Sequence, residues 1–318
     1  MTMQLSSFIK CCCSTAAAAT YTSVLLFVVG CCFTATLLPG SSAAVATNTS
    51  TTSEEISGPS SSVARTAAGQ QVVLVHGIGG GAWFFFEVVT LLNAAGFSAT
   101  AVDLSSNGIS KVIADDITSI EQYTQPLTDL LSTIDGQVIL LGHSMGGGSI
   151  SFAMEKFGPS KISKAVFLAA IMPTNGQTFF TSFPPTCFPR LIGAKDLFLY
   201  HADGSPGPTS IRANNSQLGF FAFNQSPLQF TTLAQSLFTP TPYRPGLETL
   251  NLSTASYGSI RRFYIRTGQD RAILPSEQEE ILKANPPERI FELHTADHMA
   301  FFSAPIQLFA TISYISTL

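Results

Sequence analysis

A serine between two glycines is the first residue in this chain whose type and surroundings could do chemistry. Ser144 lies in Gly-His-Ser-Met-Gly at residues 142–146, directly after the apolar run Val-Ile-Leu-Leu at 138–141. Such a run predicts a strand buried on both faces. A G-x-S-x-G pattern between a strand and a helix is typical of a nucleophile elbow, a sharp turn that presents the serine hydroxyl at the carboxyl end of a sheet. The flanking glycines are expected because a Cβ atom there would collide with neighbouring chain.

The serine needs a general base to take its proton, and a carboxylate to hold that base in the right tautomer. Enzymes with this elbow place the acid and then the histidine after the serine, at the carboxyl ends of late strands. Asp270 follows a strand predicted at 261–266, and His298 follows the last predicted strand, 289–293. We therefore predict that Ser144, Asp270 and His298 form a catalytic triad.

Backbone N–H groups near Ser144 could bind the negative oxygen that forms when the serine attacks a carbonyl group. A strand predicted at 71–75 ends in a glycine-rich loop, residues 76–83, where backbone amides can approach a substrate closely. We place the two donors of this oxyanion hole on Ile78 in the loop and on Met145, the residue after the nucleophile. The loop lacks the register of a phosphate-binding loop, and no Lys-Ser/Thr pair follows it.

The remaining histidines and the cysteines are weaker candidates. His76 and His143 lie on the two glycine turns, where we expect structural hydrogen bonds. His294 and His298 have the i, i+4 spacing of metal ligands on a helix, but this segment is predicted to be a loop. Five of the six cysteines lie before residue 33, and Cys187 alone offers neither an internal disulfide nor a zinc site, so we treat it as a packing residue. We expect no metal and no cofactor.

The composition restricts the partners of the chain. Its 318 residues are 11% charged and 45% hydrophobic, with a formal net charge of −4. This composition supports a large core and gives no reason to expect a nucleic-acid partner.

The N-terminal segment, residues 1–46, is predicted to be a signal peptide or another targeting segment. Lys10 is the only charged residue before Glu54, the apolar run 24–38 is short for spanning a bilayer, and Ala-Val-Ala at 44–46 suggests cleavage near Thr47. We expect a secreted or secretory-pathway protein. A chloroplast location and an uncleaved membrane anchor are the alternatives, and a membrane partner is expected only for the uncleaved form. Acceptor triplets for N-glycosylation begin at Asn48, Asn214, Asn224 and Asn251.

Strands and helices alternate after a Ser/Thr/Ala-rich linker at 47–69, which is expected to be disordered. Residues 70–318 are predicted to form one α/β domain with a doubly wound, mostly parallel sheet of about six strands. One helix is expected from Ser276 as its N-cap to Ala284. Periodicity fails at about 173–259, which indicates an inserted lid. Its phenylalanines could line an apolar pocket or seal the lid to the body: Phe179, Phe180, Phe183, Phe188, Phe220, Phe221 and Phe223.

Four motifs between residues 70 and 318 are similar in type and order to those of a known protein family. They are His-Gly-Ile-Gly-Gly-Gly-Ala-Trp at 76–83, Gly-His-Ser-Met-Gly-Gly at 142–147, Tyr-Gly-Ser-Ile-Arg-Arg at 257–262 and Ala-Asp-His-Met at 296–299. Together they resemble the plant methylesterase and hydroxynitrile lyase family of α/β-hydrolases. The resemblance implies the α/β-hydrolase fold, and it implies the same triad and oxyanion donors. The chain departs from that family in its long N-terminal extension, at Gly80, where relatives often have histidine, and in its lid.

The expected function is that of a serine carboxylic ester hydrolase, acting through an acyl-enzyme on small apolar esters, of which methyl esters fit the family best. The family's hydroxynitrile lyases are one alternative. By resemblance they carry a lysine after the catalytic histidine and a threonine after the histidine of the glycine loop, where this chain has Met299 and Gly77. A second alternative is a ligand-binding receptor that keeps the hydrolase fold but has little catalytic turnover. The sequence indicates neither the ester nor the oligomeric state.

Overall fold

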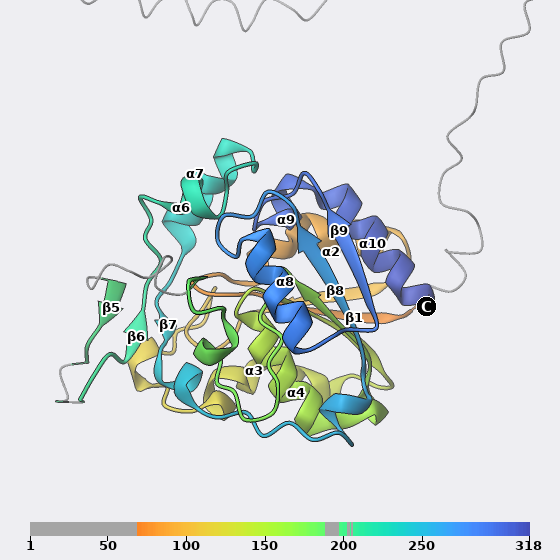
Figure 1. Ribbon diagram of the computed structural model, residues 1–318, viewed down its shortest axis with the longest axis horizontal. Coiled ribbons are helices and arrows are strands. Elements are labelled where there is room, and N and C mark those ends of the chain that lie inside the picture. The colour runs from red at the N-terminus through yellow and green to blue at the C-terminus, as the bar shows by residue number, and fades with distance from the viewer. Residues whose placement is uncertain (1–68, 188–196, 202–203, 205) are drawn as a thin grey trace, which may run out of the picture. The chain divides into compact units, whose positions relative to one another are not determined.

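The structure is a computed structural model, and it describes residues 69–187, 197–201, 204 and 206–318 (Figure 1). The predicted targeting segment at 1–46 lies outside the described residues, as do nearly all of the predicted linker and Phe188. In the described part of the chain, no helix combines the length and the apolar composition needed to cross a bilayer.

The core of the fold is a six-stranded sheet with the strand order β2-β1-β3-β4-β8-β9. Every pair of neighbouring strands in it is parallel, as the alternation of strands and helices predicts. The strands are β1 (Gln71–Val75), β2 (Ser98–Val102), β3 (Val138–His143), β4 (Ile162–Leu168), β8 (Arg261–Thr267) and β9 (Arg289–Leu293).

Both faces of this sheet are buried, which explains why its central strands are apolar at successive positions. Along β3, Val138 and Leu140 belong to one hydrophobic cluster, and Ile139 and Leu141 belong to the other. Side chains alternate between the two faces of a strand, so a strand covered on both sides has to be apolar throughout. The expected doubly wound arrangement is therefore confirmed.

Helices cover the two faces. The first cluster joins the sheet to α3, α4 and α8, and the second joins it to α2, α9 and α10. In Figure 1, α3 and α4 lie below the sheet, and α9 and α10 lie above it. The helices are α2 (Phe86–Ala94), α3 (Ile120–Thr133), α4 (Gly146–Lys161), α8 (Pro275–Ala284), α9 (Ala300–Ser303) and α10 (Pro305–Thr317). The short 3-10 helices are η1 (Ala82–Phe85), η2 (Ala114–Asp116), η3 (Phe180–Ser182), η5 (Arg244–Leu247) and η6 (Tyr257–Ser259).

The inserted segment has secondary structure that the sequence pattern did not predict. It holds a three-stranded antiparallel sheet of two-residue strands and two helices: β5 (Phe198–Leu199), β6 (Ser210–Ile211), β7 (Thr241–Pro242), α6 (Leu218–Phe221) and α7 (Leu228–Leu237). It joins the glycine loop directly, since the Gly79 N–H donates to Thr241 Oγ1 at 2.8 Å and the Thr239 N–H donates to the Gly79 carbonyl at 3.1 Å. We call residues 173–259 the lid.

The expectation that Ser276 caps α8 is wrong. The helix begins one residue earlier, at Pro275, with Leu274 in the N-cap position. The Leu274 N–H donates to Glu277 Oε2 at 2.8 Å, so the glutamate of the first turn satisfies this amide. Proline is favoured at the first helical position because it has no N–H to leave unpaired, and this preference outweighs the capping pattern.

Candidate active site

Ser144 lies on a strained turn between β3 and α4. Its φ angle is 55°, in the left-handed region that side chains other than glycine rarely adopt. A Cβ atom on Gly146 would lie 2.4 Å from the carbonyl oxygen of His76, so only glycine fits there. The strand, the strain and the close approach are the features expected of a nucleophile elbow.

Asp270 and His298 come together at the carboxyl edge of the sheet, after β8 and β9. The distance from His298 Nδ1 to Asp270 Oδ2 is 2.8 Å, and both residues are buried. A carboxylate can only accept, so His298 donates through its Nδ1–H. In the neutral ring the lone pair is then on Nε2, the atom that a general base would use.

The carboxylate of Asp270 is held rigidly by its own segment and by α8. The N–H groups of Ala272 and Ile273 each donate to Oδ1 at 2.8 Å. Oδ2 accepts from the Thr267 hydroxyl at 2.8 Å and from Gln278 Nε2 at 3.2 Å. Gln278 is fully buried. The sequence analysis missed its contribution, because nothing in a polar helix distinguishes a buried glutamine from exposed ones.

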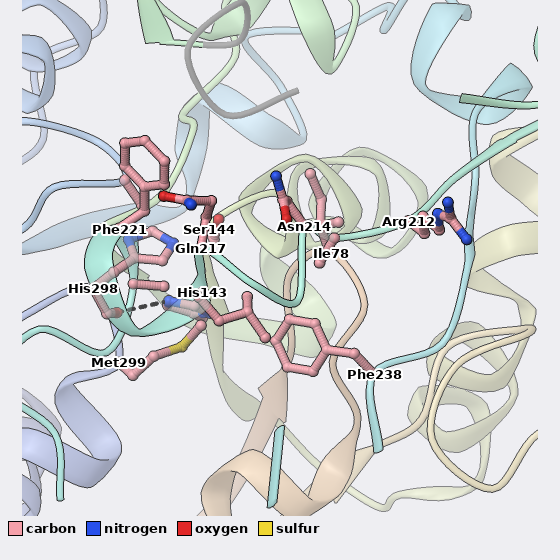
Figure 2. A pocket seen from close by; sticks show the side chains of 14 residues that line it. Ile78, His143, Ser144, Arg212, Asn214, Gln217, Phe221, Phe238, His298 and Met299 are labelled. Carbon is pink, nitrogen blue, oxygen red and sulfur yellow. Dashed lines mark hydrogen bonds between the residues drawn. The ribbon is translucent and has the colours of Figure 1, made fainter. Parts of the chain in front are cut away.

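Ser144 and His298 line the same cavity, which has a volume of about 90 Å³ and opens to solvent. Figure 2 shows both side chains on one side of this cavity, with Met299 beside them. The structure thus brings the three predicted triad residues to one place.

Ile78 follows β1 and lines the cavity together with Ser144, and Met145 directly follows Ser144 at the N-cap of α4. Within the described residues, neither backbone N–H donates a hydrogen bond. Two unpaired N–H groups beside a buried serine are suited to bind a negative oxygen.

His76 and His143 make the structural hydrogen bonds that the sequence predicts. His76 Nε2 accepts from the Leu104 N–H at 3.1 Å, which leaves Nδ1–H to donate to the Gly77 carbonyl at 2.8 Å. His143 Nε2 lies 2.9 Å from the carbonyl oxygen of His298 (Figure 2), and this bond fixes the backbone of His298. Burial lowers the pKa of His76, and burial with the neighbouring His298 lowers the pKa of His143 well below 6.5. Both rings are therefore neutral at neutral pH.

The structure sorts the lid phenylalanines between the two roles that the sequence left open, lining the cavity or sealing the lid. Of the six of these phenylalanines that the structure describes, Phe221 alone is among the lining residues, whereas Phe179, Phe183 and Phe223 are buried in the core and Phe220 is 56% exposed. Phe238, which the sequence analysis passed over, lines the cavity instead. The lining residues are Ile78, His143, Ser144, Arg212, Ala213, Asn214, Gln217, Leu218, Phe221, Ala222, Phe238, Ala272, His298 and Met299.

Metal ligation has no support among the described residues, where no group of three or more His, Cys, Asp or Glu side chains could hold an ion. Cys187 is buried, and its thiol lies 3.3 Å from the carbonyl oxygen of Ala272, in keeping with a packing role.

Comparison with known proteins agrees with this geometry. Residues 72–312 match the model of the alpha/beta hydrolase family. Methyl jasmonate esterase 1 of Vitis vinifera is 35% identical over 235 residues, an alignment that covers 72% of this chain and 90% of that protein. The chain belongs to the plant methylesterases of this family. The crystal structure of an Arabidopsis methylesterase is similar with a TM-score of 0.68 at 34% identity, over 78% of this chain and 100% of that one.

Relatives of greater length are also similar to this methylesterase-family chain. An Arabidopsis thaliana protein provisionally named methylesterase 11, chloroplastic, is 44% identical over 222 residues, covering 69% of this chain and 57% of that protein. The chain spans about half the length of this relative and of two further chloroplastic ones, between 50% and 57%.

Proposed function

We propose that this protein is a serine carboxylic ester hydrolase in which Ser144 attacks the ester and forms an acyl-enzyme. The observation that supports it most directly is the 2.8 Å contact between His298 Nδ1 and Asp270 Oδ2, at the wall of the cavity that Ser144 also lines. Membership of the methylesterase family supports the same reaction class.

In the proposed first step, His298 Nε2 takes the proton of the Ser144 hydroxyl as Oγ attacks the carbonyl carbon. Asp270 keeps the imidazole in the required tautomer and stabilises the imidazolium that forms. The N–H groups of Ile78 and Met145 bind the oxyanion of the tetrahedral intermediate. Removing one such donor typically lowers kcat by about 10²- to 10³-fold.

The intermediate collapses when His298 gives its proton to the departing alkoxide, which leaves as the alcohol. Water then enters, loses a proton to His298 and attacks the acyl carbon. Ser144 is released with its proton restored, and the acid leaves. Each step balances without a metal or an organic cofactor.

The substrate proposed here is a small ester with an apolar part, and a methyl ester fits best. The wall around Ser144 is apolar, with Leu218, Phe221, Phe238 and Met299. The names of two relatives, a methyl jasmonate esterase and a pFDCC methylesterase, support a methyl ester as the substrate.

The test uses the full chain, p-nitrophenyl acetate and a panel of aromatic and aliphatic methyl esters. We expect Ser144→Ala to lower kcat by at least about 10³-fold, because the nucleophile is lost. Ser149→Ala is the matched control, since Ser149 is buried nearby on α4 and its hydroxyl has no partner among the described residues. Equal activity of Ser144→Ala and wild type would refute the proposal, and absence of turnover on every ester would favour a receptor.

We propose a chloroplast location in place of the secretory route expected from the sequence. Five of the relatives are named as chloroplastic. Two of the four glycosylation triplets also favour a route outside the endoplasmic reticulum. Asn214 lines the cavity, and Asn224 Nδ2 donates to the Gln269 carbonyl at 2.9 Å, so a glycan on either amide would disturb the site or the lid.

A fusion of the full chain to a fluorescent protein tests the location. Coincidence with chlorophyll fluorescence is the expected result. Secretion into the medium, with a mass shift that an N-glycosidase removes, would contradict it.

A further inference from the structure

One end of the cavity is polar, in contrast to the apolar wall around Ser144. Arg212, Asn214 and Gln217 line it, and all three come from one short stretch of the lid between β6 and α6. In Figure 2, Arg212 lies farthest from Ser144 and His298, with Ile78 and Asn214 between them. No Asp or Glu is among the lining residues. The cavity therefore combines a reactive end with a positively charged end.

The donors at this end are available to a ligand. Within the described residues, the Arg212 guanidinium and the Gln217 amide make no hydrogen bond or ion pair. The Ser216 hydroxyl donates to Asn214 Oδ1 at 2.7 Å, which leaves the Asn214 NH₂ group to donate elsewhere.

The segment that bears these donors is attached to the rest of the lid. Asn215 Nδ2 donates to the Gln235 carbonyl at 3.1 Å, and Gln235 Nε2 donates back to the Asn215 carbonyl at 3.1 Å. This pair of bonds joins the stretch to α7. Arg212 also borders a neighbouring hollow together with Leu197 and Ser216, so a long ligand has room to extend past it.

We propose that Arg212 is a specificity residue that binds an anionic group at the far end of the substrate, assisted by Asn214 and Gln217. The preferred substrates are then methyl esters that carry a second, ionised acid group such as a carboxylate. Arg212 is exposed at the open side of the cavity, and no carboxylate among the lining residues competes for it. A guanidinium binds a carboxylate through two parallel hydrogen bonds. This inference rests on the proposed esterase function and narrows its substrate class.

The experiment compares esters of equal length that differ in one charge. Monomethyl adipate and monomethyl suberate are paired with methyl hexanoate and methyl octanoate, at pH 7 and low ionic strength. We expect Arg212→Gln to lower kcat/KM for the charged esters about tenfold, mainly through KM, and to leave the neutral esters almost unchanged. Arg212→Lys should retain part of the preference, and added salt should weaken it in the wild type.

Arg271→Gln is the control for charge alone. Arg271 is exposed, lies 5.1 Å from the ring of Phe220 and does not line the cavity, so its loss should leave the ratio of charged to neutral esters unchanged. Equal effects of Arg212→Gln on both members of each pair, or no effect on either, would overturn the inference.

Calorimetric binding to Ser144→Ala separates recognition from chemistry. Weaker binding of monomethyl suberate after Arg212→Gln, with unchanged binding of methyl octanoate, supports the inference even if no ester is turned over. Unchanged binding of the charged ester refutes it. Turnover of neutral esters that depends on Ser144, without any effect of Arg212, would leave the esterase proposal standing and overturn this inference alone.

Discussion

Asp297 accepts two hydrogen bonds from Ser226, one from its backbone N–H at 2.7 Å and one from its hydroxyl at 3.1 Å. The same carboxylate accepts from the N–H groups of Gln225 at 2.7 Å and Met299 at 3.0 Å, and it is fully buried. Ser226 belongs to the lid, and Asp297 precedes the proposed general base. The side chain of Asp297 points to the lid and leaves Asp270 to hold His298, so the two acids have separate roles.

Asp297→Ala should loosen the lid from the loop of His298. Three backbone N–H groups would lose their acceptor inside the protein, and the free energy of unfolding should fall by about 2–4 kcal/mol. Urea denaturation measures this loss. Ser226→Ala removes only the hydroxyl donor and should cost about 1 kcal/mol. Equal costs for the two variants would show that Asp297 does not anchor the lid.

Gly77→Ala tests how closely the glycine loop approaches the nucleophile. A Cβ atom on residue 77 would lie 2.7 Å from Ser144 Cβ, a contact too short to keep. The serine or the loop must shift, and a displacement of about 1 Å at a reacting group can cost about 10²-fold in rate. We expect kcat to fall by about that factor while the far-ultraviolet circular dichroism stays the same.

Gly219→Ala is the control for that variant. Its Cβ atom would meet Thr231 at 3.5 Å, an ordinary contact, and Gly219 does not line the cavity. Its esterase activity should match the wild type. Full activity of Gly77→Ala would contradict the close approach.

The stability of the protein should fall below pH 6.5 because two histidines are buried in the neutral form. Burial lowers the pKa of His76 and His143 below 6.5 in the folded state. The unfolded chain therefore binds more protons than the folded one between pH 6.5 and the folded pKa values. Stability is complete above pH 6.5 and decreases as the pH falls, by about 1.4 kcal/mol per pH unit for each group.

Urea denaturation between pH 7.5 and pH 5 measures this slope. His76→Gln can keep the bonds to Leu104 and Gly77 and should remove about 1.4 kcal/mol per pH unit from it. His294→Gln is the control, because the side chain of His294 is 81% exposed and its contact with Glu292 Oε1, at 3.3 Å, is a surface contact of small energy. A slope that His76→Gln leaves unchanged would contradict the assignment.

The sequence predicted the parallel sheet and the residues that the structure brings together at the candidate site. It predicted the structure of the lid poorly. Runs such as Val138–Leu141 are apolar throughout because the strand is covered on both faces, and this signal is local. The lid strands have two residues each, too few for any periodicity, and tertiary hydrogen bonds such as that between Gly79 and Thr241 hold them.

The side chains that shape the cavity show the same limit. Phe221 and Phe220 are adjacent in α6, yet only Phe221 lines the cavity. Which of them faces inward depends on how α6 packs, and composition does not record this. Arg212 was likewise missed, because a single arginine in an irregular segment gives no pattern until the fold places it opposite Ser144.

The wild-type protein should not release cyanide from cyanohydrins. This separates it from the hydroxynitrile lyases of the family that its motifs resemble. A departing cyanide anion needs a positive charge near the serine, and an uncompensated charge in an apolar site costs several kcal/mol. Met299 occupies the position after His298, is buried and lines the cavity, and it offers no charge. The cation of the cavity, Arg212, lies at its other end (Figure 2). We expect mandelonitrile and acetone cyanohydrin to give no more cyanide with the wild type than with Ser144→Ala. Cyanide release that Ser144→Ala abolishes would assign the protein to the lyases.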